Sequence, residues 1–208
     1  VGLDGSIFVL GTTEGNLDGQ NNKGETDIFI SKFNKYGFKL WTILSGTSEF
    51  EDASNIVISN DGSFYVTGKT TGNLDGQINF GQEDGFISKF NSSGIKQWTK
   101  LIGTSSNDKL NDLVINKDNF IYVVGNTDGN LDNLDKQREA MSDGFISKFN
   151  SEGIKIWTKL IGSPYDDYAY DIATDSNGYL YVSGRTYGTL DGETNNGEDD
   201  IFISKFNT

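Results

Sequence analysis

Short segments rich in aromatic and β-branched residues recur along the chain, and each ends at a turn signal. In the copy that runs from about Glu51 to Gly103, the first segment is Asn55–Ile58, and the turn pair Asp61-Gly62 follows it. The second is Ser63–Thr67, which stops at Gly68. Two further segments complete the copy: Asp84–Phe90 and Ile95–Ile102. Segments of this kind, bounded by Gly, Asn and Asp, are typical of β-strands, so the pattern predicts four strands in each copy.

Two phrases return along the chain at a long and nearly constant spacing. Gly-Asn-Leu-Asp-Gly or a close variant starts at Gly15, Gly72, Gly129 and Gly188, and Ile-Ser-Lys-Phe-Asn starts at Ile30, Ile87, Ile146 and Ile203. The spacing is 57 residues, with one step of 59. A period in this range indicates a tandem repeat, in which one supersecondary unit stacks on its neighbours to bury a shared core.

Four strands joined by tight turns and repeated at this period describe the blade of a β-propeller. We therefore predict an all-β fold: one β-propeller repeat domain or segment over residues 1–208, built from four tandem four-stranded blades of ~57 residues. The repeat units are about 1–50, 51–106, 107–165 and 166–208. Helix should be nearly absent, because no window combines a helical apolar period with freedom from turn residues. A parallel β-helix is the structural alternative, but its shorter coils would not need tight two-residue turns.

The first and last blades are expected to be incomplete. The first copy has no counterpart of the first strand, and the last copy ends before its Trp-bearing fourth strand, which leaves fourteen strands. Unpaired strand edges favour pairing with another chain. We therefore expect either that the chain continues in a larger protein or that it self-associates through its terminal blades. The expected contacts are Ile7–Val9 at one end and Ile201–Ile203 at the other.

Three units of the repeat carry a family resemblance: Tyr65–Gln77, Asp84–Asn91 and Lys96–Trp98. In this order they resemble the SBBP type of bacterial β-propeller repeat, over essentially the whole chain. The departures are small, with Asn133 in place of the final Gly of the third phrase and Thr189 in place of Asn in the fourth. The resemblance implies a propeller, often on exported or surface-anchored bacterial proteins of undefined activity. It brings no catalytic residues.

Composition narrows the function further. The formal net charge is −13, which argues against nucleic acid and anionic lipid as partners. No apolar run approaches the roughly 18 residues that would insert into a membrane. The chain has no Cys and no His, which removes thiol nucleophiles, disulfides, Cys/His zinc sites and the usual general base at neutral pH. We therefore expect that the protein is not an enzyme.

The loop after the second strand carries the only metal-like spacing. Short oxygen-bearing side chains at these offsets are typical of calcium loops. The candidate ligands are Glu14, Asn16, Asp18 and Glu25 in the first copy and Asp128, Asn130, Asp132 and Glu139 in the third. The second copy has Thr71 and Gln82 at two of these positions, and the fourth has Tyr187 and Thr189. Turn chemistry alone explains the pattern, so we expect no cofactor, with calcium as the one candidate.

Trp41, Trp98 and Trp157 occupy the same place in three copies. Aromatic rings at such positions can stack on sugars, but their identical phase favours packing between blades, and we expect Trp98 to be largely buried. Lysines and aspartates also recur, at Lys32, Lys89, Lys148 and Lys205 and at Asp27, Asp84, Asp143 and Asp200. An active site needs one distinct arrangement of groups, whereas a repeat supplies the same group several times. We therefore expect these lysines and aspartates to cap turns and to form ion pairs between blades.

The segment Tyr165–Asp171 is the least repeat-like part of the chain and concentrates acidic and aromatic residues. It would suit a recognition rim. Its acids nevertheless align with Glu51 and Asn55 in one copy and with Asp108 and Asp112 in another, which favours capping of a strand start.

The sequence therefore favours a non-catalytic, extracellular or surface-displayed bacterial β-propeller repeat protein. It would act as a structural or interaction scaffold, self-assembling or bound to a protein partner through its terminal blades. The alternative is a carbohydrate-binding, lectin-like propeller that takes a glycan between blades. A polysaccharide-acting enzyme is third, and without His it would need paired carboxylates. Fold alone does not decide between them.

Overall fold

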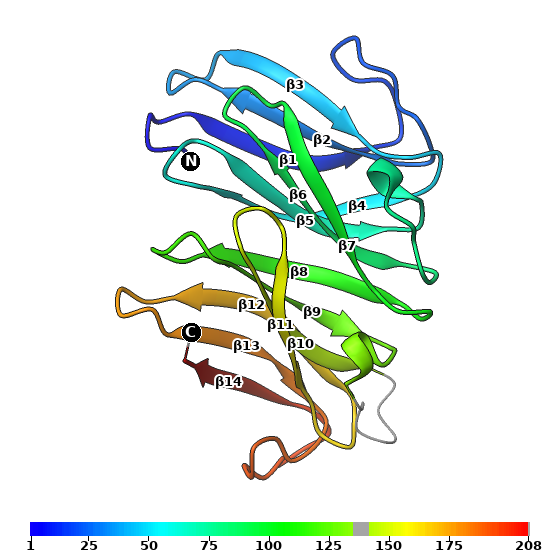
Figure 1. Ribbon diagram of the computed structural model, residues 1–208, viewed down its shortest axis with the longest axis vertical. Helices are drawn as coiled ribbons and strands as arrows, with labels where there is room; N and C mark the ends of the chain where they lie inside the picture. The colour runs from blue at the N-terminus through cyan, green and yellow to red at the C-terminus, as the bar shows by residue number, and fades with distance from the viewer. Residues whose placement is uncertain (135–141, 208) are drawn as a thin grey trace.

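Residues 1–134 and 142–207 are described by the structure, a computed structural model, and they form four antiparallel sheets (Figure 1). The first sheet contains β1 (Ile7–Thr13), β2 (Asp27–Phe33) and β3 (Lys39–Ser45). The second contains β4 (Glu51–Ile58), β5 (Phe64–Thr70), β6 (Asp84–Phe90) and β7 (Lys96–Ile102). The third contains β8 (Asp108–Ile115), β9 (Ile121–Thr127), β10 (Asp143–Phe149) and β11 (Lys155–Ile161). The fourth contains β12 (Asp167–Thr174), β13 (Leu180–Thr186) and β14 (Asp200–Phe206).

Each sheet is one blade, and we number the blades one to four in chain order. Within a blade the strands pair with their neighbours in the sequence, so every sheet is an antiparallel meander. The predicted all-β fold is confirmed, and so are the missing first strand of blade one and the missing fourth strand of blade four. Over the described residues, the only helical segments are two single 3-10 turns, η1 (Leu74–Gly76) and η2 (Leu131–Asn133). Neither is long and apolar enough to cross a bilayer.

The blades stack face to face in sequence order. In Figure 1 blade one lies at the top and blade four at the bottom, and no strand pairing joins these two sheets among the described residues. The first strands of blades two, three and four contact each other in turn, β4 with β8 and β8 with β12. They therefore form the inner side of the stack. The strands at the opposite edge of the sheets, β3, β7 and β11, hold the fourth position of the repeat and form the outer side. We call these the inner and outer strands.

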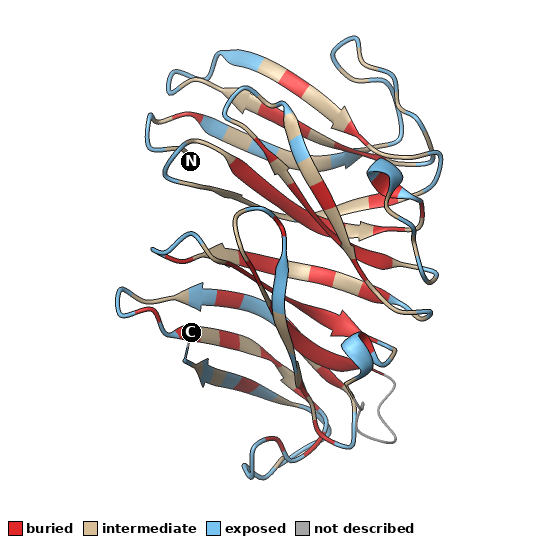
Figure 2. Ribbon diagram, viewed as in Figure 1, coloured by how far each residue is buried: buried red, intermediate tan, exposed pale blue. Residues whose placement is uncertain are grey.

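Apolar clusters fill the spaces between consecutive blades. Between blades one and two, Ile30 of β2 packs in one cluster with Phe64 and Phe86. On the other side of blade two, Ile87 belongs to a second cluster together with Phe145 of blade three. A third cluster joins blades three and four. We call the side of a blade that meets the preceding blade its leading face and the other side its trailing face. The two central strands of each middle blade, β5 with β6 and β9 with β10, are buried on both faces, as their red colour in Figure 2 shows.

A bulge in each inner strand explains a glycine of the repeat. The pairing of β4 with β5 shifts register between Ala53 and Asn55, and β8 and β12 carry the same irregularity. A Cβ on Gly68 of β5 would lie 2.0 Å from the carbonyl oxygen of Asp52, which is far too close. Blade one has no inner strand, and a Cβ on its equivalent Gly11 would meet only the ring of Phe29, at 2.7 Å.

We predict that Gly68→Ala lowers the free energy of unfolding by about 1–3 kcal/mol, as overpacking of a filled site does. Gly11→Ala should cost clearly less. Both new methyl groups meet a phenylalanine ring, but only the one at residue 68 also meets a backbone carbonyl that cannot move aside. Chemical denaturation of the two variants measures the difference. Equal losses would show that the ring contact, and not the bulge, requires glycine.

Candidate functional site at the open terminal blades

In a complete blade, polar side chains hold the outer strand in addition to the backbone ladder. In blade two, Asp75 lies in the loop after β5 and has left-handed backbone geometry, with φ 52°. Its carboxylate accepts hydrogen bonds from Lys96 Nζ at 2.6 Å and Thr99 Oγ1 at 2.5 Å, both on β7. Ser88 of β6 is hydrogen-bonded to the same Thr99 at 2.7 Å. Burial would raise the pKa of Asp75, but the hydrogen bonds from Lys96 and Thr99 outweigh it and lower this pKa.

The same attachment recurs in the other two blades that have an outer strand. The equivalent contacts are Asp18 with Lys39 and Thr42, Ser31 with Thr42, Asp132 with Lys155, and Ser147 with Thr158. Sequence reasoning assigned these aspartates to turns or to a metal and missed their contact with the outer strand. A signal was present, because Lys follows the Asp by 21 residues in two copies and by 23 in the third.

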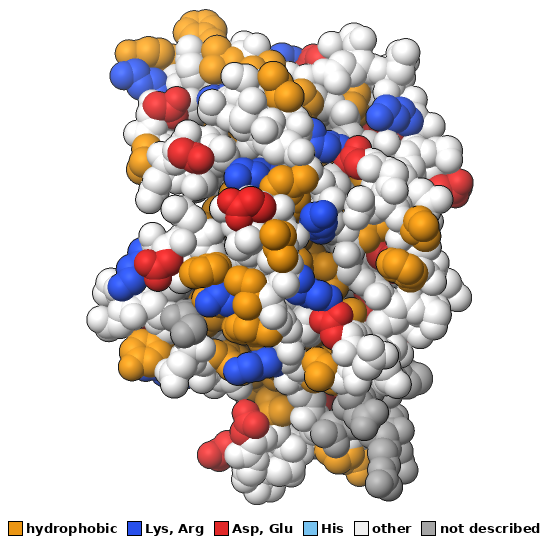
Figure 3. Space-filling model, in the orientation of Figure 1, with side chains coloured by type: hydrophobic (Ala, Val, Ile, Leu, Met, Phe, Trp, Pro, Cys, Tyr) orange, Lys and Arg blue, Asp and Glu red, His pale blue; other side chains and the backbone are white. Residues whose placement is uncertain are grey.

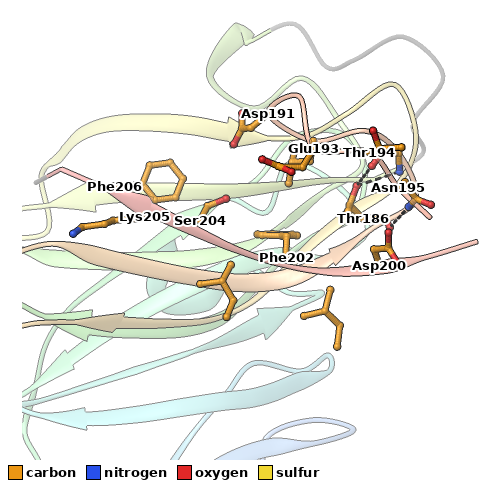
Figure 4. A pocket seen from close by; sticks show the side chains of 14 residues that line it. Thr186, Asp191, Glu193, Thr194, Asn195, Asp200, Phe202, Ser204, Lys205 and Phe206 are labelled. Atoms are coloured by element: carbon orange, nitrogen blue, oxygen red, sulfur yellow. Dashed lines mark hydrogen bonds between the residues drawn. The ribbon is translucent and has the colours of Figure 1, made fainter. Parts of the chain in front are cut away.

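Blade four has the attachment points without the strand. Beside β14 lies a groove of about 450 Å³, lined among others by Asp191, Glu193, Ser204 and Phe206 (Figure 4). Asp191 occupies the repeat position of Asp75 and has the same left-handed geometry, with φ 51°. Ser204 occupies the position of the β6 serine. Within the described residues, no strand pairs with the outer edge of β14.

The outward faces of the terminal blades expose side chains that are buried inside the stack. Ile203 on the trailing face of blade four is 75% exposed, whereas Ile87 at the same repeat position is 0% exposed. Its neighbour Ile201 is 86% exposed. On the leading face of blade one, Val9 is 42% exposed, against 1% for Val66 at the equivalent position. Both ends of the stack, as formed by the described residues, therefore expose apolar surface of the kind that the middle blades bury against a neighbour.

Comparison with known proteins agrees with this architecture. The model of the SBBP beta-propeller repeat matches residues 97–132 and 156–190. These stretches are SBBP repeats. The resemblance seen in the sequence is thus confirmed over these two stretches. Each matched stretch runs from an outer strand through the inner strand of the next blade and ends in the loop that follows its second strand.

Two curated relatives are much longer than this chain. The regulatory protein FlaEY of Caulobacter vibrioides is 24% identical over 198 residues, which cover 85% of this chain and 20% of the relative. The uncharacterized WD repeat-containing protein L264 of Acanthamoeba polyphaga mimivirus is 23% identical over 198 residues, covering 77% of this chain and 14% of the relative. The chain therefore spans a fifth or less of the length of these relatives.

Trp98 packs between blades two and three, as expected, against the cluster that joins them. Trp98 is only partly buried. Its ring meets Tyr65 edge-on, with centroids 5.9 Å apart, and the turn at Gly153 of the next blade lies against its other part. The outer strand lies at the rim of the stack, so solvent reaches the part of the indole that the neighbouring blade does not cover.

The repeated aspartates cap loops, whereas the predicted ion pairs between blades are replaced by other contacts. Buried Asp84 accepts a hydrogen bond from the backbone N–H of Phe80 at 2.9 Å, four residues earlier. Lys89 does reach the next blade, but it donates to the carbonyl oxygen of Ser151 at 3.2 Å and lies over the ring of Tyr65.

The acids of Tyr165–Asp171 have different roles, and Asp166 accepts the backbone N–H of Ser142 in blade three at 3.1 Å. Asp167 caps the strand start as expected, accepting the backbone N–H of Ser163 at 2.5 Å. The side chain at the position of Asp171 does not cap a strand start. In blade three this position is Asp112, and its carboxylate accepts the backbone N–H of Ile172 in blade four at 2.9 Å.

Asp112 therefore links three inner strands, because it also accepts a hydrogen bond from the side-chain amide of Asn55 in blade two. Burial raises the pKa of Asp112 to about 6, and its contact with the Asp171 carboxyl acts in the same direction. Backbone N–H groups, including that of Leu113 at 2.8 Å, oppose this rise.

The candidate calcium ligands are placed as follows. Asn16 accepts the backbone N–H of Asn22 at 3.0 Å, which closes the loop on itself. The side chains of Glu14, Glu25, Asp128 and Asn130 are on exposed residues, and Glu139 lies outside the described residues. Across residues 1–134 and 142–207, no group of three or more acidic side chains is arranged to hold a metal ion. Calcium binding at these loops stays a prediction.

We predict that Asp112 makes stability depend on pH. A folded-state pKa raised from 3.8 to about 6 means that the folded protein binds the proton more tightly, so stability is greatest at low pH and is lost as pH rises through 6. The expected loss between pH 5 and pH 8 is about 1–1.5 kcal/mol, one pH unit below the folded pKa being worth about 1.4 kcal/mol. Asp112→Asn should flatten this dependence, while Asp118→Asn on an exposed turn should leave it unchanged. A wild-type pH profile in Asp112→Asn would contradict the assignment.

If calcium binds, we expect it to bind the loops of the first and third copies, since those carry the full set of oxygen-bearing side chains. Isothermal titration with millimolar calcium checks this. Asp132→Ala should then remove about half of the binding, and Asp75→Ala in the second copy should remove none. An absence of heat at this concentration leaves turn formation and attachment of the outer strand as the whole role of these loops.

Proposed function

We propose that this chain is a non-catalytic scaffold of SBBP blades, displayed outside a bacterial cell or on its surface, that joins neighbours through its terminal blades. One observation carries the proposal. Residues that the middle blades bury between sheets, such as Ile87 and Val66, have exposed counterparts at both ends in Ile203 and Val9. Exposed apolar faces of this kind mark surfaces that bind other proteins.

The side chains that would carry chemistry are already used to hold the fold. Thr99 is hydrogen-bonded to both Asp75 and Ser88 within a blade, and Asp84 caps a loop. The same groups recur in other copies, whereas an active site needs one distinct arrangement. These contacts support a scaffold in preference to a polysaccharide-acting enzyme.

The relatives support a module within a larger assembly. FlaEY is named a regulatory protein and L264 a WD repeat-containing protein, and the aligned part is a small share of each. On the face viewed in Figure 3, acidic and basic side chains are interspersed, without one large patch of a single sign. Together with the net charge of −13, this fits a protein partner better than nucleic acid.

The ends of two copies are suited to a head-to-tail contact. Inside the stack, the trailing face of one blade always meets the leading face of the next. The trailing face of blade four, with Ile201 and Ile203, therefore matches the leading face of blade one, with Ile7 and Val9, in another copy. A contact between two different surfaces continues from copy to copy unless its rotation closes a ring.

Glycan binding is the second candidate, and partial exposure of the three tryptophans is the observation in its favour. The parts of the Trp98 ring nearest the fold are covered by Tyr65 and by the turn at Gly153. A sugar would therefore have only the remaining rim of each indole. Binding on a glycan array that Trp98→Phe weakens without loss of fold would favour this candidate.

We predict that Ile203→Lys weakens self-association of the chain by about 10–100-fold, because burial of one Ile contributes about 1.5–3 kcal/mol and a lysine cannot be buried there. Ile78→Lys, at a loop residue that is 66% exposed, is the matched control and should associate like the wild type. Multi-angle light scattering over a wide concentration range measures the effect. A wild-type chain that is monomeric throughout would refute the association.

A further inference from the structure

We propose that a cleft at one end of blades two, three and four binds a polyhydroxylated ligand, either a free monosaccharide or the terminal sugar of a glycan. This binding would be a further activity of the scaffold, and it does not depend on contact through the terminal blades. The cleft has a volume of about 270 Å³, and the side chains that line it do not include a tryptophan. The argument uses six of its lining residues, Lys69, Glu83, Lys109, Asn126, Ser142 and Tyr168.

The cleft lies where the first strands begin and the second strands end. Lys69 is near the end of β5, Lys109 is near the start of β8, and Tyr168 is near the start of β12. Three consecutive blades therefore contribute to it. Blade three, which has a neighbour on each face, forms its centre.

This end of the stack collects positions at which the copies differ. The residue before the last threonine of the second strand is Lys69 in blade two, Asn126 in blade three and Arg185 in blade four. The second residue of the first strand changes in the same way, through Asp52, Lys109 and Tyr168. The third strand, in contrast, repeats Phe-Ile-Ser-Lys-Phe in all four copies. A binding site needs one distinct arrangement of groups, and the repeat provides one here.

Variation of solvated surface does not account for these differences. Asn126 and Ser142 are only 5% exposed or less, and their counterparts in blade two are Lys69 and Glu83. Buried positions that differ in charge from copy to copy do not serve the shared architecture of the blades. They are therefore free to serve a function of blade three alone.

Asn126 brings a buried donor without a partner to the cleft. Its Oδ1 accepts the backbone N–H of Ala169 in blade four at 3.1 Å and the side-chain amide of Asn111 at 3.4 Å, which fixes the orientation of the Asn126 amide. Among the described residues, no acceptor meets its buried Nδ2. A buried polar group without a hydrogen bond lowers stability, so a ligand that accepts from Nδ2 would recover this loss.

Lys109 adds an ammonium group without a counter-ion. It stands directly opposite Asn126 in the pairing of β8 with β9. Side chains in this relation leave the sheet on the same face about 5 Å apart, so both donors can reach one ligand. The ion pairs formed within residues 1–134 and 142–207 do not include Lys109, whereas Lys69 is held by Glu83 at 2.7 Å.

Other groups of the cleft favour a neutral ligand that both donates and accepts. Glu83 has a second carboxylate oxygen besides the one that Lys69 binds. Burial raises the pKa of Tyr168, and the carboxylate of Asp166 acts in the same direction, so the phenol keeps its proton and can donate or accept. A hydroxyl group has one donor and two acceptor sites, and adjacent hydroxyls of one sugar ring can meet ammonium, amide and carboxylate groups together. Mixed charges along the cleft disfavour a simple anion.

The test titrates the isotopically labelled 208-residue chain with glucose, galactose, mannose and N-acetylglucosamine, each up to tens of millimolar, and follows the amide signals by nuclear magnetic resonance. At least one sugar should shift the backbone amides of Lys109 and Ser142 and the side-chain amide of Asn126 in a saturable manner. The amide of Lys117, in the turn at the opposite end of blade three, should not move. A glycan array run in parallel distinguishes a terminal sugar from a free one.

Two variants remove the donors. Asn126→Asp keeps an acceptor for Ala169 but loses Nδ2, and it should weaken sugar binding about tenfold. Lys109→Gln should also weaken it about tenfold. Lys117→Gln, the same change at an exposed position of the same blade, should leave the affinity unchanged. Unfolding curves establish that each variant is folded, and Lys109→Gln tests the site even if Asn126→Asp does not fold.

Three results would overturn the inference. The first is an absence of saturable binding by every sugar in both assays. The second is binding that Asn126→Asp and Lys109→Gln leave unchanged, and a loss in Trp98→Phe would then place the sugar at the tryptophans. The third is saturable binding of glycine or alanine without any sugar, which would identify a zwitterionic ligand. Ile203→Lys should leave sugar binding unchanged, so self-association and this inference can fail separately.

Discussion

A sheet of three or four strands has two faces, and no blade of this protein can bury both of them by itself. Contact between consecutive blades is therefore the interaction on which the structure depends. Every apolar cluster in the described residues lies between two blades and none lies within one. The stability of such an array depends on contacts between neighbouring blades. Among the described residues, blades two and three have a neighbour on each face and blades one and four have a neighbour on one face.

Apolar and polar contacts have different roles in this structure. Apolar side chains such as Ile87 and Phe145 attach blade to blade, and they do so without strong directional preference. The outer strand is fixed by directed hydrogen bonds, from Lys96 and Thr99 to Asp75, which specify its position along the neighbouring strand.

Local sequence signals determined most of the fold. The segment Asp84–Phe90 expected from its turn residues is β6 in the structure, and the absence of a first strand was visible from the repeat alone. What could not be predicted was contact across long separations. Asp112 meets Ile172 across 60 residues, and its role as a link between inner strands depends on how blades stack. The requirement for glycine at residue 68 likewise comes from a bulge in the neighbouring strand β4. The sequence around Gly68 does not indicate this bulge.

The near identity of the outer strands has a consequence for how the chain is made. Lys96–Ile102 and Lys155–Ile161 differ only at Gln97 and Ile156, and the edges of β6 and β10 that receive them carry the same sequence. Either strand could therefore complete either blade, and an exchange would leave one whole repeat looped out of a compact but wrong structure. Synthesis from the N-terminus avoids this, because blade two can close before the second strand has emerged from the ribosome. Refolding from the fully denatured chain has no such order, so a fraction trapped with exchanged strands is the expected cost of repeating the same strand.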